Sequence, residues 1–430
     1  MTPTAEQTAR PAPYGAGSPS WTAVVAGVAV MLVGADYAVY RTLSAGTVLG
    51  LALAPVWFPA VSRYRGAWPL LSVGAMAGVA GVWLTETAAT DHRTSTASTM
   101  TTTFILLNIL VGVPVVLWAR TAMRTSLVAV LFGAGMVAAV PLGGLGFDAH
   151  AWRFQYSVPV SVLALAVVWH LGWRWTQVVV ALTLAAGSAL AGGRSTFAML
   201  LVAATVVAWQ SLGHARTKAG SRLRVVALGT VLIFAIYQIG QGLILDGYLG
   251  ESAQERTEVQ IATTGNILLG ARPEMGATVA LMRDHPLGFG SGTMSSLQDI
   301  MVAKEGMASL GYNPDNGYVN KYMFGSGYEL HSLIGDTWAS FGVLGLVFTV
   351  MAVWLSCRSC VGLVARRAAP ALLVYLAVRL LWNALFGPVL ASSTLLVAAV
   401  ALMLTLKGAD DAFALDPSAG SPDQEPSRAA

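Results

Sequence analysis

Long apolar runs alternate with short polar segments along most of the chain. A run of roughly 17 to 21 apolar residues is long enough to cross the ~30 Å hydrocarbon core of a bilayer as a helix. Such runs begin near Trp21, Leu43, Leu70, Thr103, Ser126, Tyr156, Thr176, Thr196, Val225, Leu333, Ala368 and Val389. The pattern predicts an all-α, polytopic membrane protein of about twelve transmembrane helices.

One long polar interval, residues 246–331, separates the runs near Val225 and Leu333. Within it, Arg272 precedes Pro273, a residue favoured at the first position of a helix. The apolar residues that follow at helical spacing are Met275, Val279 and Met282. We therefore expect a short amphipathic helix here.

A second helix is expected farther along the same interval. His285-Pro286 should end the first helix, and the glycines of residues 288–292 should form a tight irregular turn. Thr293 is expected to cap the next helix. Its apolar face would contain Met294, Leu297 and Met301. Both helices would lie on the bilayer surface or on the bundle, where they would cover a lateral cavity.

Composition supports the membrane assignment. Of the 430 residues, 55% are hydrophobic and only 11% are charged, whereas about 25% are charged in a soluble domain. Residues 1–20 lack a basic region and a cleavage site, so we expect a disordered cytoplasmic segment instead of a removable signal peptide. The transmembrane domain is predicted at residues 21–407. The acidic, Pro- and Ser-rich residues 408–430 are predicted to be a disordered cytoplasmic tail.

The basic residues predict the orientation, because Lys and Arg are retained on the cytoplasmic side of short loops. With the N-terminus inside, the cytoplasmic loops contain Arg63, Arg65, Arg120, Arg124, Arg174, Arg216, Lys218, Arg222, Arg224, Arg358, Arg366, Arg367 and Lys407. The opposite short loops contain only Arg41, Arg93, Arg153 and Arg194. We expect a multi-pass protein of the bacterial cytoplasmic membrane with both termini inside and the 246–331 loop outside. The net charge of +4 then reflects topology and does not indicate nucleic-acid binding.

Two motifs of other functional classes are incomplete. Cys357 and Cys360 form a C-x-x-C pair, but the chain has no further cysteines to complete a zinc site. We interpret them as reduced thiols. The spaced glycines of residues 288–292 resemble a nucleotide loop, yet no strand precedes them and the predicted topology places them outside.

Three arginines are candidates for binding an anionic substrate. Arg194 lies between two apolar runs, where a diphosphate could bind its guanidinium bidentately; the alternative is a loop arginine that reaches lipid phosphates. Arg272 lies beside a predicted helix N-terminus, which attracts anions. Arg379 lies within an apolar run, where a charge usually faces a cavity or a partner. Its structural alternative is a salt bridge with Asp336.

Among the histidines, His331 lies between the polar interval and the next apolar run. Because histidine titrates near neutral pH, His331 suits proton transfer at an external acceptor hydroxyl. We interpret His285, which precedes a proline, as a structural capping residue. The spacing of Asp91 and His92 indicates no partner.

Three motifs occur in a recognisable order. They are Gly193-Arg194-Ser195, then Arg272 upstream of His285-Pro286-Leu287-Gly288-Phe289-Gly290, then His331-Ser332 leading into Phe341-Gly342-Val343-Leu344-Gly345. Over roughly residues 187–350 the chain resembles the O-antigen ligase and polymerase superfamily. Gly193 and Ser332 depart from the residues more common at their positions in that family, which leaves the subtype open.

The resemblance implies a C-type glycosyltransferase fold. It also implies an enzyme that transfers a saccharide from a polyprenyl diphosphate-linked oligosaccharide to an acceptor glycan. It implies that Arg194 and Arg272 bind the diphosphate and that His331 activates the acceptor, while Arg379 is added from its charge alone. Fixed guanidiniums can replace a divalent cation, and no cluster of acidic ligands is visible, so neither metal nor cofactor is expected. A flippase and chain-length-control proteins are the expected protein partners.

Several functions remain open. Usage rich in Ala, Gly, Val and Arg is typical of a GC-rich bacterium and favours polymerisation of an exopolysaccharide or cell-wall glycan. The alternatives are ligase-like transfer of a finished glycan and a twelve-helix polysaccharide or solute transporter. The large asymmetric loop disfavours a transporter and Arg379 favours one. A mannosyltransferase with an acidic pair in its first external loop is disfavoured, because only Asp36 lies near that loop.

Overall fold

The computed structural model describes residues 21–140, 151–212 and 272–407, with a few positions between 223 and 230. The predictions for residues 1–20 and 408–430 lie outside the described residues. So do residues 246–271 of the polar interval and most of the run near Val225.

The described chain is mostly helical. Its first half contains α1 (Trp21–Ala35), β1 (Ala38–Tyr40), β2 (Leu43–Ser44), α2 (Ala45–Ala52), α3 (Ala54–Val61), α4 (Ala67–Ala88), α5 (Thr96–Ala122), α6 (Thr125–Ala138), the π-helix η1 (Trp152–Tyr156), α8 (Ser157–Leu171), α9 (Arg174–Leu190) and α10 (Arg194–Leu212). Its second half contains α14 (Glu274–Asp284), α15 (Leu297–Ala308), the π-helix η2 (Tyr318–Met323), α16 (Leu333–Ala365), α17 (Ala371–Phe386) and α18 (Val389–Met403). The two strands pair antiparallel, with Ala38 opposite Ser44.

Within the described residues, five helices are long and apolar enough to cross a membrane. They are α4, α5, the continuous η1–α8 segment, α10 and α16. Four shorter apolar helices accompany them: α1, α6, α17 and α18. These helices indicate a membrane protein, and the total of about twelve spans stays a prediction.

The apolar run near Leu43 does not form one spanning helix. It is divided at Leu53 into α2 and α3, each of eight residues. Eight helical residues extend only about 12 Å, far less than the ~30 Å hydrocarbon core. Pro55 and Pro59 lie in α3, and proline interrupts the backbone hydrogen bonding of a helix.

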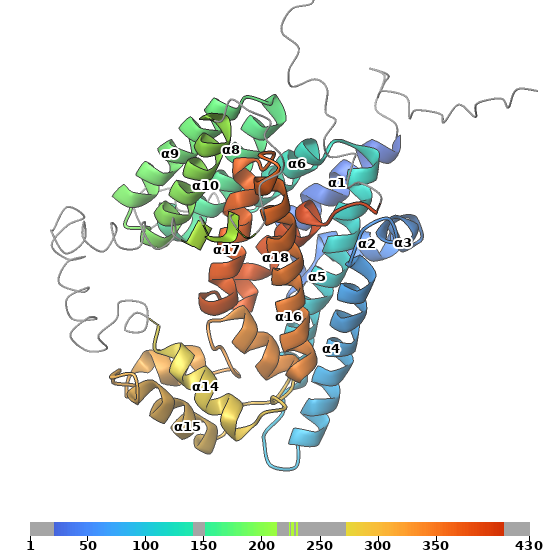
Figure 1. Cartoon of the computed structure of the whole chain (residues 1–430). Helices are drawn as coiled ribbons and strands as arrows, with labels where there is room; N and C mark the ends of the chain where they lie inside the picture. The colour runs from blue at the N-terminus through green and yellow to red at the C-terminus, as the bar shows by residue number, and fades with distance from the viewer. Residues whose placement is uncertain are drawn as a thin grey trace, which may run out of the picture.

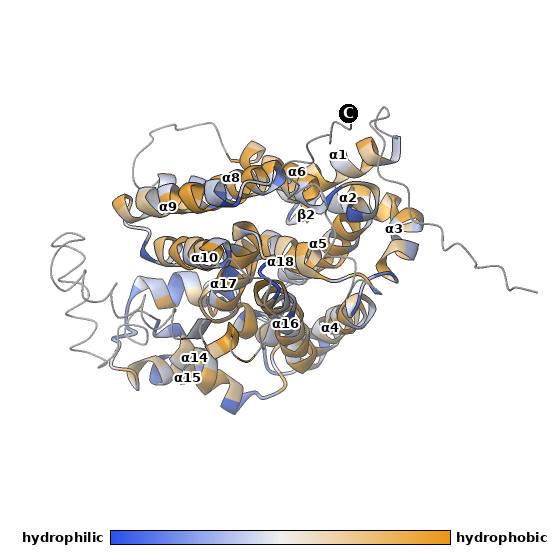
Figure 2. Ribbon diagram, turned by 45° about the horizontal axis from the view of Figure 1, so that its top comes forward, coloured by the Kyte–Doolittle hydropathy of each residue, from blue (hydrophilic) through white to orange (hydrophobic). Residues whose placement is uncertain are grey.

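The helices form three layers in the tilted view of Figure 2. One row contains α9, α8, α6 and α1, the middle row contains α10, α17, α18 and α5, and α16 and α4 lie on the other side. The side chains of α18 are buried along most of its length. A helix that is apolar on all faces belongs in such a position, so the middle layer forms the core.

The helix ends are grouped as an alternating topology requires. At the predicted cytoplasmic ends, Arg65 N donates to Thr405 O at 2.9 Å and Lys407 N donates to Arg63 O at 2.7 Å. At the predicted outer ends, Met294 N donates to Arg93 O at 2.8 Å. Which of the two groups faces the cell exterior stays a prediction.

Two helices of the polar interval, α14 and α15, pack against each other at one end of the bundle (Figure 1). His285 ends α14 as expected, and the predicted apolar face is in part exposed, with Val279 46% exposed. The face that packs inward contains Glu274, Ala277, Thr278 and Leu281. Gly276 approaches the Gly306 carbonyl so closely that a Cβ there would overlap it, and this contact sets the rotation of α14.

The predicted start of α15 is wrong. Ser296, not Thr293, caps the helix, in a capping box completed by Asp299. Thr293 Oγ1 instead donates to Phe289 O at 2.8 Å. Leu297 and Met301 are 82% and 70% exposed. In a membrane protein, an apolar face exposed at this level suits contact with the lipid interface.

The glycine-rich turn passes between α4 and α16. Gly290 has φ +111, its amide donates to Ala339 O at 2.9 Å, and a Cβ there would overlap the Thr85 backbone nitrogen. Only glycine fits both the conformation and the space. The predicted irregular turn is therefore confirmed.

We expect Gly290→Ala to destabilise the protein by about 1 to 3 kcal/mol, because the added methyl group meets backbone and φ is positive. Thermal unfolding of the purified protein in detergent should show a lower midpoint. Gly317→Ala is the matched control, since Gly317 has φ −65 and a Cβ there would meet nothing within 4 Å. Equal midpoints for the two variants would contradict this account of the turn.

Candidate functional site

The C-terminal half of α17 presents one face toward the predicted site residues. Arg379, Trp382 and Phe386 follow at spacings of three and four, which places them on the same side of a helix. Their positions lie near the end of α17 at Phe386. Of the other predicted residues, Arg272 contacts this face directly.

Arg379 connects this face to the start of α10. Its Nη1 donates to Thr196 Oγ1 at 3.2 Å, and Thr196 lies in the first turn of α10, which begins at Arg194. The Arg379 Nε is buried and has no hydrogen-bond partner among the described residues. A buried donor without a partner is costly, so this nitrogen is available to an anionic ligand.

The structure shows another role for Asp336 than the predicted salt bridge with Arg379. The Asp336 carboxylate is 3% exposed. It accepts hydrogen bonds from Leu330 N at 2.7 Å and Val389 N at 2.8 Å. Two backbone amides therefore satisfy it, and it holds the segment before His331 against the start of α18.

Arg272 approaches the same face of α17 from the other side. Its guanidinium carbon lies 5.8 Å from the Trp382 ring centroid and 5.7 Å from that of Phe386. These are cation–π distances, and an aromatic pair can hold a guanidinium without neutralising its charge. Arg272 immediately precedes Pro273, the N-cap of α14. The charge thus lies at a helix N-terminus, as predicted.

His331 lies where the polar interval meets α16. Its φ is +54, a left-handed conformation that residues other than glycine seldom adopt. Ser332 holds the position, because its Oγ donates to Ala384 O of α17 at 2.9 Å and accepts from Gly335 N at 3.1 Å. The backbone conformation turns His331 out of the α16 helix line, and its side chain is partly exposed.

Tyr318 joins His331 to the Arg272 segment. The Tyr318 and His331 ring centroids are 5.6 Å apart, and the Tyr318 hydroxyl donates to Glu274 Oε1 at 2.5 Å. Burial, together with the Glu274 carboxylate, raises the pKa of Tyr318 above its ordinary range. The hydroxyl therefore stays protonated and keeps this contact at physiological pH.

The segments that carry the four predicted residues thus meet around the end of α17. Arg194 and Arg379 lie on the α10 side, Arg272 stacks on the aromatic pair, and His331 is fixed beside Ala384. The arrangement offers guanidiniums to an anion and an imidazole to a neighbouring hydroxyl.

Sequence reasoning missed the residues that support this arrangement. Trp382 and Phe386 could have been found, because they follow Arg379 at helical spacing. Thr196, Glu274 and Tyr318 had no such signal, since their roles depend on which distant segments meet. Of the other histidines, His92 and His285 contact a third residue, Asp299, and not this set.

Comparison with known proteins adds no identity to this geometry: no family model, curated protein or solved structure matches the chain.

Proposed function

We propose that the protein is a membrane glycosyltransferase. It transfers a saccharide from a polyprenyl diphosphate-linked donor to an acceptor glycan at the outer face of the bacterial cytoplasmic membrane. The observation that supports this most is the meeting of three segments at the end of α17: Arg379 contacts Thr196 in the first turn of α10, Arg272 stacks on Trp382 and Phe386, and Ser332, next to His331, contacts Ala384. A lipid-linked diphosphate presents its charge at the membrane boundary, where these side chains belong in the predicted topology.

The arginines bind the leaving group in this reaction. Transfer breaks the bond between the anomeric carbon and the diphosphate oxygen, and negative charge develops on the departing polyprenyl diphosphate. Guanidiniums fixed before the reaction stabilise that charge without reorganising. Arg379 offers its buried Nε, and the Arg272 guanidinium is positioned by the Trp382 and Phe386 rings.

His331 acts on the acceptor. Its imidazole takes the proton from an acceptor hydroxyl as that oxygen attacks the anomeric carbon, so a new glycosidic bond forms and the configuration inverts. His331 Nδ1 lies 3.1 Å from Glu329 O. That contact leaves Nε2 as the nitrogen that accepts the proton, with Nδ1–H donating to the carbonyl.

Polymerisation of an exopolysaccharide or cell-wall glycan is the form of the reaction that we favour. A polymerase joins lipid-linked repeat units, whereas a ligase transfers a finished glycan to another acceptor. The lipid-linked glycans that accumulate after deletion of the gene distinguish a polymerase from a ligase. Single lipid-linked repeats should accumulate if the protein is a polymerase, and long lipid-linked chains should accumulate if it is a ligase.

The direct test uses purified protein in lipid nanodiscs with a radiolabelled polyprenyl diphosphate oligosaccharide. We expect longer labelled glycans and released polyprenyl diphosphate without any ion gradient. The same protein in sealed vesicles should not move free oligosaccharide across the bilayer. Gradient-dependent flux without new glycosidic bonds would instead show a transporter and overturn the proposal.

A further inference from the structure

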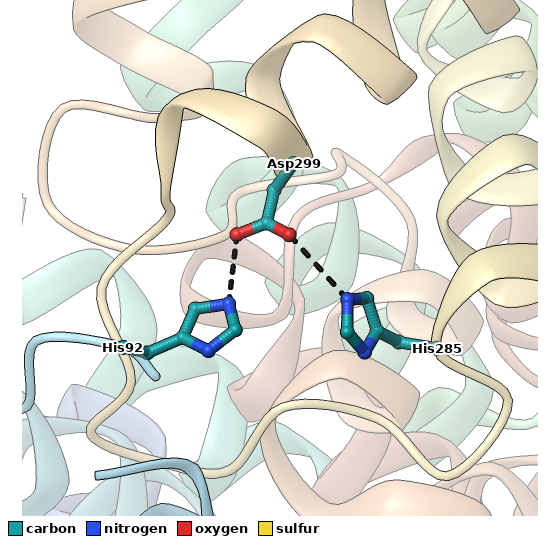
Figure 3. Close-up of side chains that lie close together, drawn as sticks. All are labelled: His92, His285 and Asp299. Atoms are coloured by element: carbon teal, nitrogen blue, oxygen red, sulfur yellow. Dashed lines mark hydrogen bonds and ion pairs between the residues drawn. The ribbon is translucent and has the colours of Figure 1, made fainter. Parts of the chain in front are cut away.

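Three segments that are far apart in the sequence meet beside the α14–α15 pair. They are the loop after α4, the end of α14 and the first turn of α15. The loop is fixed there by backbone contacts, since Ser95 N donates to Gly292 O and Met294 N donates to Arg93 O, both at 2.8 Å. Each segment contributes one side chain to a common cluster, shown in Figure 3: His92, His285 and Asp299.

The ligand-type atoms of this cluster converge. His92 Nε2 lies 3.0 Å from Asp299 Oδ2, and His285 Nε2 lies 3.6 Å from Asp299 Oδ1. In Figure 3 the carboxylate lies between the two rings, with one oxygen toward each. The three groups offer one ligand atom each, all within 4.8 Å of one another.

These spacings fit a tetrahedral ion. Zinc binds histidine nitrogen and carboxylate oxygen at about 2.0 to 2.2 Å, which puts neighbouring ligand atoms about 3.3 Å apart. The two histidine–carboxylate separations, 3.0 Å to Oδ2 and 3.6 Å to Oδ1, lie on either side of that value. Two imidazoles with one carboxylate also form a donor set typical of zinc.

Further contacts orient His92 and Asp299. His92 Nδ1 lies 2.8 Å from Asp91 Oδ1, the arrangement in which a carboxylate fixes the tautomer of a metal-binding histidine. Asp299 Oδ2 accepts from the Tyr328 hydroxyl and from Ser296 N, both at 2.7 Å. Asp284 Oδ2 lies 3.4 Å from His285 Nε2, so a second carboxylate is present at the more exposed side.

The surroundings shield the cluster in part. Asp299 is 1% exposed and the His92 side chain is 7% exposed. Phe289 covers the cluster, with its ring centroid 4.7 Å from that of His285. His285 is 35% exposed, which leaves solvent access for a fourth ligand such as water.

We propose that His92, His285 and Asp299 form a binding site for a divalent metal ion of the zinc class. The ion would join the loop after α4 to the ends of α14 and α15, and so fix the position of the α14–α15 pair on the bundle. This role is structural and does not depend on the proposed glycosyl transfer. The sequence prediction that no metal is needed concerned the transfer step, which the arginines serve.

Zn²⁺ binding to the tag-free, chelator-treated protein in detergent tests the site. Isothermal titration should show one saturable site per chain. With Co²⁺ as probe, the visible absorption of tetrahedral cobalt should appear with the same stoichiometry. His92→Gln and His285→Gln should each remove that signal, because glutamine retains a hydrogen-bonding side chain but not the imidazole ligand. His170→Gln is the control, since His170 contacts Ser126 instead.

Asp91→Asn provides a second, milder variant. It keeps all three ligands and alters only the group that orients His92, so the affinity for Zn²⁺ should fall about tenfold to a hundredfold while the stoichiometry stays the same. Unfolding temperatures measured in chelator would show whether a variant is folded before metal is added. No saturable binding by the wild type, or unchanged binding by both glutamine variants, would overturn the proposal.

Discussion

Arg272→Ala is expected to lower the turnover of a polyprenyl diphosphate donor by about a hundredfold to a thousandfold, the usual effect of removing one preorganised charge stabiliser. The loss should appear mainly in kcat, because the guanidinium acts on charge that develops as the diphosphate leaves. Release of labelled glycan from the donor by purified protein measures it. The fold should be little affected, since Arg272 packs on the faces of Trp382 and Phe386 and precedes α14 instead of lying within it.

Arg283→Ala is the matched control for this variant. Arg283 lies in the last turn of the same helix and is exposed, so its removal changes the net charge equally without changing the α17 face. Arg272→Lys should recover only part of the activity, because lysine lacks the planar group that stacks on aromatic rings and binds phosphate bidentately. Equal turnover by the Arg272→Ala and Arg283→Ala variants would remove Arg272 from the site.

His331→Asn is expected to reduce kcat by about a hundredfold to ten-thousandfold, the range associated with loss of a general base. Asparagine is the appropriate replacement because the residue has φ +54, and asparagine tolerates the left-handed region better than alanine does. The donor KM should change little, since the arginines and not the histidine hold the diphosphate. Steady-state kinetics with varied donor at a fixed acceptor concentration separates the two constants.

A comparison with His331→Ala distinguishes chemistry from backbone strain. If the imidazole is what matters, both variants should be equally inactive, and the alanine variant should unfold at a lower temperature. Activity of His331→Asn within a few-fold of wild type would show that another group accepts the proton. Glu274 would then become the first alternative, because its Oε2 is buried and has no hydrogen-bond partner among the described residues.

The helical architecture could be predicted from the sequence, because a long apolar run in a bilayer satisfies its backbone hydrogen bonds most readily as a helix. The error near Leu43 arose from length alone, since hydropathy windows do not register where a run bends at Leu53 between α2 and α3. The start of α15 was wrong for a different reason. Thr293 suits a helix cap, but its hydroxyl donates to Phe289 O and Ser296 caps the helix instead.

The candidate site was partly accessible from the sequence. Arg194 and His331 lie at the edges of apolar runs, Arg379 lies within one, and Arg272 precedes a predicted helix, so each has a local signal. Their association around α17 depends on segments distant in the sequence and could not be predicted from local patterns. The same holds for the hydrogen bond of Asp336 with the backbone amide of Val389. The His92 cluster shows the limit most clearly, because His92 and Asp299 are 207 positions apart and no periodic pattern connects them.

The two amide contacts of Asp336 also affect how the protein can move. One carboxylate joins the backbone before His331 to the first residue of α18, while Ser332 joins it to the last turn of α17. The imidazole and the aromatic wall beneath Arg272 therefore shift together when neighbouring helices tilt. In the proposed reaction, this coupling keeps the spacing between the imidazole and the aromatic pair constant.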